Sequence, residues 1–190
     1  MQKKSLFTTK KLVLTALLAA LTVAGSAIRV VMPIDIAGTS AFHLGNIMCA
    51  LSGILLGPWL GGLAAGMGSA IYDMFNPLYI SEAWITFLTK GLYGLATGLV
   101  VYAWKNKSWG YGRAILGTLA GAITYALLYL SKSYFYSGML LQGLSADAAW
   151  AIVIAKLPAT IFNLSVAVIF APILALAIHK ALKQAHLTLE

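Results

Sequence analysis

The chain has 190 residues, of which 61% are hydrophobic and only 9% are charged. Soluble domains are about 25% charged, so this composition excludes a water-soluble fold and predicts an integral membrane protein. In a soluble protein, the formal net charge of +8 would suggest binding to nucleic acid. In a membrane protein, however, excess Lys and Arg usually mark the cytoplasmic side, so no nucleic-acid partner is expected.

At roughly 20 residues per spanning helix, the chain can form about six spans with short loops, and hence one domain over residues 1–190. The predicted fold is an all-α integral membrane bundle of six transmembrane helices. In chain order the helices are expected at 11–31, 43–56, 59–75, 84–104, 113–136 and from the N-cap Ser145 to about 183. Loops are expected at 34–40, 79–83, 105–112 and 137–144.

The second and third helices form a hairpin over residues 42–76, joined by an uncharged turn at Gly57-Pro58. Small residues at four-residue spacing let helices approach closely in lipid. Polar groups lie at both outer ends of this hairpin, including His43, Asn46, Asp73 and Asn76. The sequence therefore predicts a tightly packed hairpin with a polar, water-filled mouth.

The sixth helix begins with Ser145 as N-cap and Asp147 in the first turn, where a carboxylate opposes the helix dipole. At 1.5 Å per residue this helix is roughly 57 Å long. That exceeds one straight span, so a bend at Pro158 or Pro172 is expected.

The distribution of charge predicts the orientation, with both termini cytoplasmic. Nine of the 13 Lys and Arg fall on one side: Lys3, Lys4, Lys10, Lys11, Lys105, Lys107, Arg113, Lys180 and Lys183. Four of the five acids fall on the other side: Asp35, Asp73, Glu82 and Asp147.

Four cations remain, each within about two turns of the outer end of a predicted helix. One interpretation makes them anchors that reach the interface, or partners of the four outer acids, with Asp73 pairing one of them. The other interpretation rests on their neighbours, because each cation heads a polar stripe at helical spacing. The stripes are Thr15, Thr22, Ser26 and Arg29; Thr86, Lys90, Tyr93 and Thr97; Tyr125, Tyr129, Lys132 and Tyr136; and Lys156, Thr160 and Asn163.

Lipid cannot solvate such stripes, so they are expected to face a common, outward-opening pocket that holds a polar organic molecule. The candidate substrate-binding residues are Arg29, His43, Asn46, Asp73, Asn76, Lys90, Tyr93, Tyr129, Lys132, Tyr136, Lys156 and Asn163. His43 also suits a capping or packing role, and Tyr125, the deepest stripe residue, suits plain core. Tyr79, Trp84, Tyr134 and Trp150 are interpreted as interfacial aromatics.

Enzyme motifs are absent from the sequence: there is no His-Glu-x-x-His, phosphate-binding Gly loop or Gly-x-Ser-x-Gly elbow. His179 and His186 lie at the predicted cytoplasmic end, and Cys49 is the only cysteine. We therefore expect no metal site, cofactor or disulfide. An intramembrane hydrolase using Asp73 and His43 stays open as an alternative.

The hairpin string Phe42-His-Leu-Gly-Asn, Leu-Ser-Gly-Ile-Leu-Leu-Gly-Pro and Gly-Gly-Leu-Ala-Ala-Gly-Met-Gly-Ser, followed by Asp73, resembles the S components of energy-coupling factor (ECF) vitamin importers. The resemblance covers nearly the whole chain. An Ala-x-x-x-Ala motif of that family corresponds to Ala16 and Ala20.

This resemblance implies a substrate-capture subunit in the bacterial plasma membrane, acting with a transmembrane coupling subunit and two ATPase subunits. In the family, an ATP-driven rearrangement topples the S component so that its pocket faces the cytoplasm. Ala16, Ala20, Gly62 and Gly66 would belong to the face that docks on the coupling subunit.

Overall resemblance favours cobalamin as the substrate, while the cations suit an anion such as pantothenate and the tyrosines suit a ring such as pyridoxine. A stand-alone secondary transporter is the remaining alternative, although Gly57-Pro58 has no counterpart in the second half of the chain.

Overall fold

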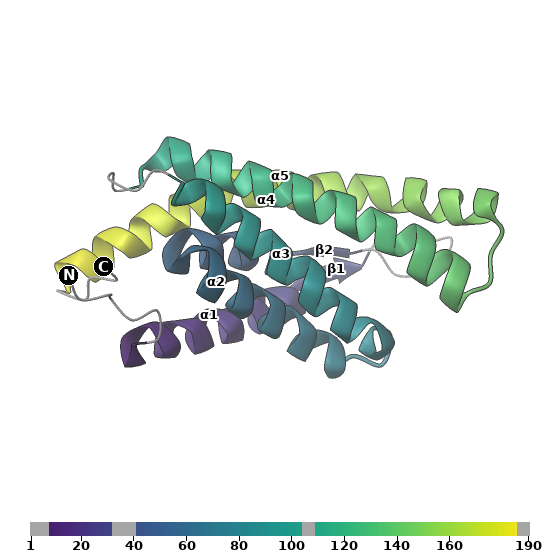
Figure 1. Cartoon of the computed structure of the whole chain (residues 1–190), viewed down its shortest axis with the longest axis horizontal. Coiled ribbons are helices and arrows are strands. Elements are labelled where there is room, and N and C mark those ends of the chain that lie inside the picture. The colour runs from purple at the N-terminus through teal and green to yellow at the C-terminus, as the bar shows by residue number, and fades with distance from the viewer. Residues whose placement is uncertain (1–7, 32–40, 104–108, 186–190) are drawn as a thin grey trace.

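A computed structural model describes residues 8–31, 41–103 and 109–185. The predicted loop at 34–40, with Asp35, and the first half of the loop at 105–112 lie outside these ranges. The elements are α1 (Thr9–Ala27), β1 (Arg29–Val31), β2 (Ala41–His43), α2 (Gly45–Met74), η1 (Ile80–Glu82), α3 (Ala83–Val101), α4 (Tyr111–Ser131), η2 (Lys132–Leu141) and α5 (Ala146–Gln184). Figure 1 shows a helical bundle in which α1 begins and α5 ends at the same end of the molecule.

Five helical stretches in the described part of the chain are long and apolar enough to cross a membrane. One of them, α2, is two segments joined at Gly57, whose φ of 79° and ψ of −173° are not helical. Only glycine adopts such a backbone readily. The arms fold back on each other, since Cys49 Sγ lies 3.6 Å from Ser69 Oγ. The predicted hairpin is therefore confirmed, whereas the count of six membrane crossings stays a prediction.

Glycine–backbone contacts hold α2 and α3 together at the centre of the bundle. A Cβ atom on Gly61 would lie 2.5 Å from Ser52 O in the other arm of α2, and one on Gly94 would lie 2.7 Å from Gly61 O. Only hydrogen fits at these positions, so dispersion between closely packed backbones stabilises the contact.

Two of the four residues predicted to dock on a partner are part of this internal contact. Gly62 and Gly66 are buried, and Cβ atoms there would meet the backbone oxygens of Gly91 and Phe87 in α3 at 2.8 and 2.7 Å. Their small size serves the packing of α3, and a role of this pair in docking on a partner stays a prediction. Ala16 and Ala20 lie exposed on α1, as docking residues would.

The all-α prediction missed a short antiparallel ribbon. The first helix ends at Ala27 rather than near 31, and β1 pairs with β2 in the register Arg29↔His43 and Val31↔Ala41. Arg29 therefore does not continue the α1 stripe; it projects from a strand. Thr15, Thr22 and Ser26 of that stripe are buried in α1 as predicted.

The second half of the chain departs from prediction beyond α4. The predicted outer loop at 137–144 is largely the π-helix η2, which continues α4 without a break. At the start of α5, Ser145 Oγ accepts the Ala148 N–H at 3.4 Å and Asp147 lies in the first turn, which confirms the predicted N-cap. The yellow C-terminal part of α5 runs at an angle to its green N-terminal part (Figure 1), in accord with the prolines inside this helix.

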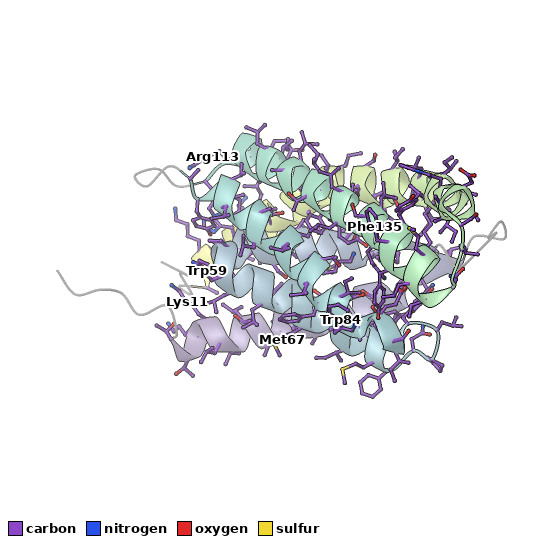
Figure 2. All side chains as sticks on the ribbon, turned by 45° about the vertical axis from the view of Figure 1, so that its right-hand side comes forward. Lys11, Trp59, Met67, Trp84, Arg113 and Phe135 are labelled. Atoms are coloured by element: carbon purple, nitrogen blue, oxygen red, sulfur yellow. The ribbon has the colours of Figure 1, made fainter. Side chains whose placement is uncertain are left out.

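The two ends of the bundle carry different side chains. Figure 2 shows Lys11, Trp59 and Arg113 at one end, with Trp84 and Phe135 toward the other. Trp59 and Trp84 are exposed, as interfacial aromatics are. Cys49 is fully buried among the core residues of α2.

Candidate functional site

A cavity of about 390 Å³ lies at the end of the bundle where α1, the ribbon, η1 and η2 meet, and all nine elements contribute to its wall. Its volume falls within the range of about 300–1,000 Å³ that is usual for sites of drug-sized ligands. Four cations line it and two carboxylates, Asp73 and Glu82, face them, so the lining has a formal charge of +2 with His43 neutral.

Nine of the twelve predicted substrate-binding residues line this cavity: Arg29, His43, Asn46, Asp73, Lys90, Tyr129, Lys132, Lys156 and Asn163. The other three do not. Tyr93 is fully buried beneath Tyr125, Tyr136 bonds Trp84 and the Ser81 carbonyl at the rim, and Asn76 caps the turn after α2 through the Leu78 N–H. Convergence of the four polar stripes is therefore visible in the structure, while their role in binding stays a prediction.

The ribbon places Arg29 and His43 opposite each other on the cavity wall. The Arg29 guanidinium donates to Tyr72 Oη at 2.9 Å and to Tyr79 Oη at 2.6 Å. His43 Nδ1 accepts the Gly45 N–H at 3.2 Å. Burial, together with the positive charges of Lys90 and Arg29, lowers the pKa of His43 to about 3, so this imidazole is neutral.

Lys90 reaches the floor of the cavity from α3 and is 5% exposed. Its ammonium donates to Asn46 Oδ1 and lies 3.9 Å from the centroid of the Tyr125 ring. Beneath it, Tyr93, Tyr125 and Tyr129 form a continuous stack with ring centroids 5.6 and 5.5 Å apart. Cation–π attraction is strongest where water is excluded, so the aromatic floor stabilises the buried charge.

Glu82 is held at the mouth by two side chains of η2. Lys132 Nζ lies 2.5 Å from Oε2, and Ser137 Oγ donates to Oε1 at 2.5 Å. Residues five apart point about 140° apart on an α-helix, because each residue turns it by about 100°. The i→i+5 repeat of a π-helix brings such positions onto one side. The π-helical geometry is therefore what lets Lys132 and Ser137 hold one carboxylate together.

The remaining predicted residues make contacts that the sequence left open. Asn163 Nδ2 donates to Ala41 O at 2.8 Å and its Oδ1 accepts the His43 N–H at 3.0 Å, so this amide clamps β2 to α5. Lys156 Nζ lies 3.5 Å from Ser133 Oγ and 5.6 Å from the Tyr129 ring centroid. Asp73 has Thr86 as its side-chain hydrogen-bond partner.

Sequence reasoning missed several lining residues. Tyr79 was expected at the membrane interface and Tyr125 in the core, yet both face the cavity. Tyr125 is 6% exposed and belongs to the buried core, as predicted, and it also lines the cavity. Arg29 donates a hydrogen bond to Tyr79, which holds Tyr79 in the lining, and its place at the membrane interface stays a prediction. The unpredicted polar lining residues also include Ser26, Ser69, Tyr72, Ser81, Glu82, Thr86, Thr89, Ser137, Gln142 and Thr160. Of these, Ser26, Thr86 and Thr160 belong to the stripes and could have been found from their spacing.

The arrangement suits reversible binding of a small polar molecule that carries a ring. The tyrosine stack offers an aromatic surface, and the surrounding Arg, His and Lys side chains supply hydrogen-bond donors. No nucleophile in the described cavity lining is paired with a base in the geometry of a hydrolytic site.

Comparisons with known proteins agree with this description. The family model described as "ECF-type riboflavin transporter, S component" matches residues 6–180. A protein of Pyrococcus woesei described as "Uncharacterized protein in gap 3'region" is 37% identical over 120 residues, which cover 63% of this chain and 74% of that relative. Because the family match extends over nearly the whole membrane bundle and its cavity, the chain belongs to the family of S components of ECF-type riboflavin transporters.

Proposed function

We propose that this chain captures a ring-bearing vitamin outside the cell for an ECF importer. The observation that carries this proposal is the polar, tyrosine-floored cavity of about 390 Å³ at one end of an apolar bundle. The exposed Lys10, Lys180 and Lys183 lie at the opposite end. The positive-inside rule makes that end cytoplasmic, so the cavity opens outward.

Energy for release into the cell comes from partners. The sequence has no phosphate-binding Gly loop, so ATP hydrolysis belongs to the two ATPase subunits of the importer. The transmembrane coupling subunit docks on α1, which presents Ala16 and Ala20 between exposed apolar side chains such as Val13 and Leu17. Two alanines one turn apart allow a partner helix to approach closely.

The volume of the cavity limits the substrate. About 390 Å³ lies near the lower end of the range for drug-sized ligands, which suits a fused heteroaromatic vitamin of riboflavin size or smaller. Cobalamin, the vitamin that overall resemblance favours, joins a corrin macrocycle to a nucleotide and is several times larger than a drug-sized ligand. The geometry therefore favours a smaller vitamin over cobalamin; riboflavin, pyridoxine and pantothenate types all satisfy the size limit.

Co-expression with an ECF coupling subunit and two ATPase subunits tests this proposal. The chain should co-purify with them, and proteoliposomes with the complex should accumulate a vitamin only when ATP is supplied to the ATPase side. Uptake by the chain alone, driven by an ion gradient without ATP, would instead identify a secondary transporter. A chain that neither co-purifies nor supports uptake would refute the proposal.

A further inference from the structure

We propose that the vitamin carries an anionic group, a carboxylate or phosphate, which binds between Arg29, His43 and Lys90. This inference rests on the proposed function and adds the chemical class of the substrate. It comes from an imbalance in the cavity lining around these three residues, which offer more hydrogen-bond donors and positive charge than the neighbouring acceptors and carboxylates offset.

The donor groups converge because of the fold. Arg29 and His43 are register partners in the ribbon, and residues directly opposite each other in an antiparallel pair project on the same face. His43 and Asn46 lie three residues apart, and Asn46 accepts a hydrogen bond from Lys90. Strand, hairpin and α3 thus bring three nitrogen-bearing side chains to one cavity, where the charges of Lys90 and Arg29 both act on His43.

Protein acceptors do not use all of these donors. Arg29 Nε is buried and has no hydrogen-bond partner within the described ranges. His43 is neutral and Nδ1 accepts from Gly45, so the ring proton is on Nε2. Among residues 8–31, 41–103 and 109–185, the hydrogen bonds of His43 involve its backbone N–H and Nδ1, and none involves this Nε2. Lys90 has three N–H groups and one acceptor, Asn46 Oδ1, among the same residues.

The charges show the same imbalance. Glu82 is engaged by Lys132 and Ser137 on the η2 side. Arg29 bonds two neutral tyrosine hydroxyls, and no carboxylate of the described residues forms an ion pair with Lys90. Besides Glu82, Asp73 is the one acidic side chain in the described lining. Even if the negative charge of Asp73 balances the positive charge of Lys90, no carboxylate in this lining balances the charge of Arg29.

A buried cation with neutral partners is costly in a membrane protein and commonly marks a substrate or ion pathway. A bound carboxylate or phosphate would offset this cost, because its oxygens accept several charge-assisted hydrogen bonds at once. The ring of the same ligand would lie on Tyr125 and Tyr129, next to Lys90 on the cavity floor.

Matched pairs of ligands that share a skeleton test the inference on the full-length protein purified in detergent. Suitable pairs are pantothenate with pantothenol, riboflavin 5′-phosphate with riboflavin, and pyridoxal 5′-phosphate with pyridoxal. Calorimetry at fixed ionic strength should show at least one acid bound tenfold or more tightly than its neutral partner. The pairs separate the two sources of the anion, because pantothenate is a carboxylate and the other two acids are phosphate esters.

Lys90→Met supplies the second arm, with Lys180→Met as the matched control on an exposed residue of α5. The Lys90 variant should lose at least tenfold in affinity for the acid and change little for the neutral partner, while the control leaves both unchanged. Arg29→Gln, at the partly exposed ribbon, provides the same test if the buried substitution prevents folding.

Equal or weaker binding of every acid relative to its neutral partner would overturn the inference and leave the vitamin-capture proposal standing. Failure of all six compounds to bind, in a chain that also fails to assemble with the coupling module, would overturn both.

Discussion

Two glycines of α3, three residues apart and facing α2, give a sharp test of the packing argument. We expect Gly94→Ala to destabilise the protein relative to Gly91→Ala. A Cβ atom at Gly94 would lie 2.7 Å from Gly61 O and 3.0 Å from Ala65 Cβ, whereas one at Gly91 would lie 3.5 Å from Gly62 O, an ordinary contact. The first needs movement of a neighbouring backbone and the second does not.

The size of the effect follows from this comparison. Ala is favoured over Gly inside a helix by roughly 0.5–1 kcal/mol, and this gain is common to both variants. Overpacking costs about 1–3 kcal/mol, so that amount separates the two. At about 2–4 °C per kcal/mol for a chain of this size, the melting temperatures should differ by roughly 2–12 °C.

Thermal unfolding in one detergent, followed by tryptophan fluorescence, measures this difference. Gly91→Ala should melt at or slightly above the unsubstituted protein and Gly94→Ala below it. Equal melting temperatures for the two variants would refute the conclusion that backbone contact at Gly94 stabilises the bundle.

Three further predictions concern the mouth, the ribbon and the docking face. Glu82→Gln should lower the free energy of unfolding by about 1.5–3 kcal/mol, the contribution of a hydrogen bond to a charged group, because buried Lys132 loses its carboxylate partner. Adding Lys132→Met should restore part of this loss. A double-mutant cycle that shows no coupling between the two substitutions would contradict the ion pair. The pKa of His43 in the folded protein is about 3, below the ordinary value of about 6.5, so the unfolded chain binds the proton more readily and stability should fall as the pH drops from about 6.5 toward 3. The melting temperature of His43→Gln should decline less over this range than that of the unsubstituted protein. An identical decline for both proteins would show that His43 is not held neutral. Ala16→Trp and Ala20→Trp should abolish ATP-driven uptake by the assembled importer while leaving ligand affinity within twofold, and a parallel loss of affinity would place α1 in the binding site instead of the docking face.

Local chemistry made several features predictable. Gly57-Pro58 marked the turn of the hairpin because glycine permits a positive φ and proline ends a helix, and Ser145 marked a helix start because its hydroxyl accepts from the first turn. The 3.6-residue period of the polar stripes also predicted that Lys90 and Lys156 face one cavity, and both residues line it. These predictions needed only neighbouring residues and an apolar solvent.

Features that depend on distant contacts were not predictable in the same way. The pairing of β1 with β2 requires Arg29 to meet His43 across a connection, and nothing within either three-residue strand specifies that partner. The π-helix η2 changes the angular repeat, so Tyr136 leaves the face that α-helical spacing assigned to it and Ser137 enters the lining. The glycines at 62 and 66 showed where a backbone comes close, but not whether that backbone was α3 or a partner.

The buried thiol of Cys49 makes the molecule convenient for chemical mapping. It is 0% exposed and is the only cysteine of the chain, so alkylating reagents that require a solvated thiolate should leave the native protein unmodified. A cysteine introduced at Ala146, an exposed residue at the start of α5, or at Lys183 would then be the sole reactive group. Membrane-impermeant maleimides applied to intact cells would label whichever of these positions faces outward, with the native thiol left in place.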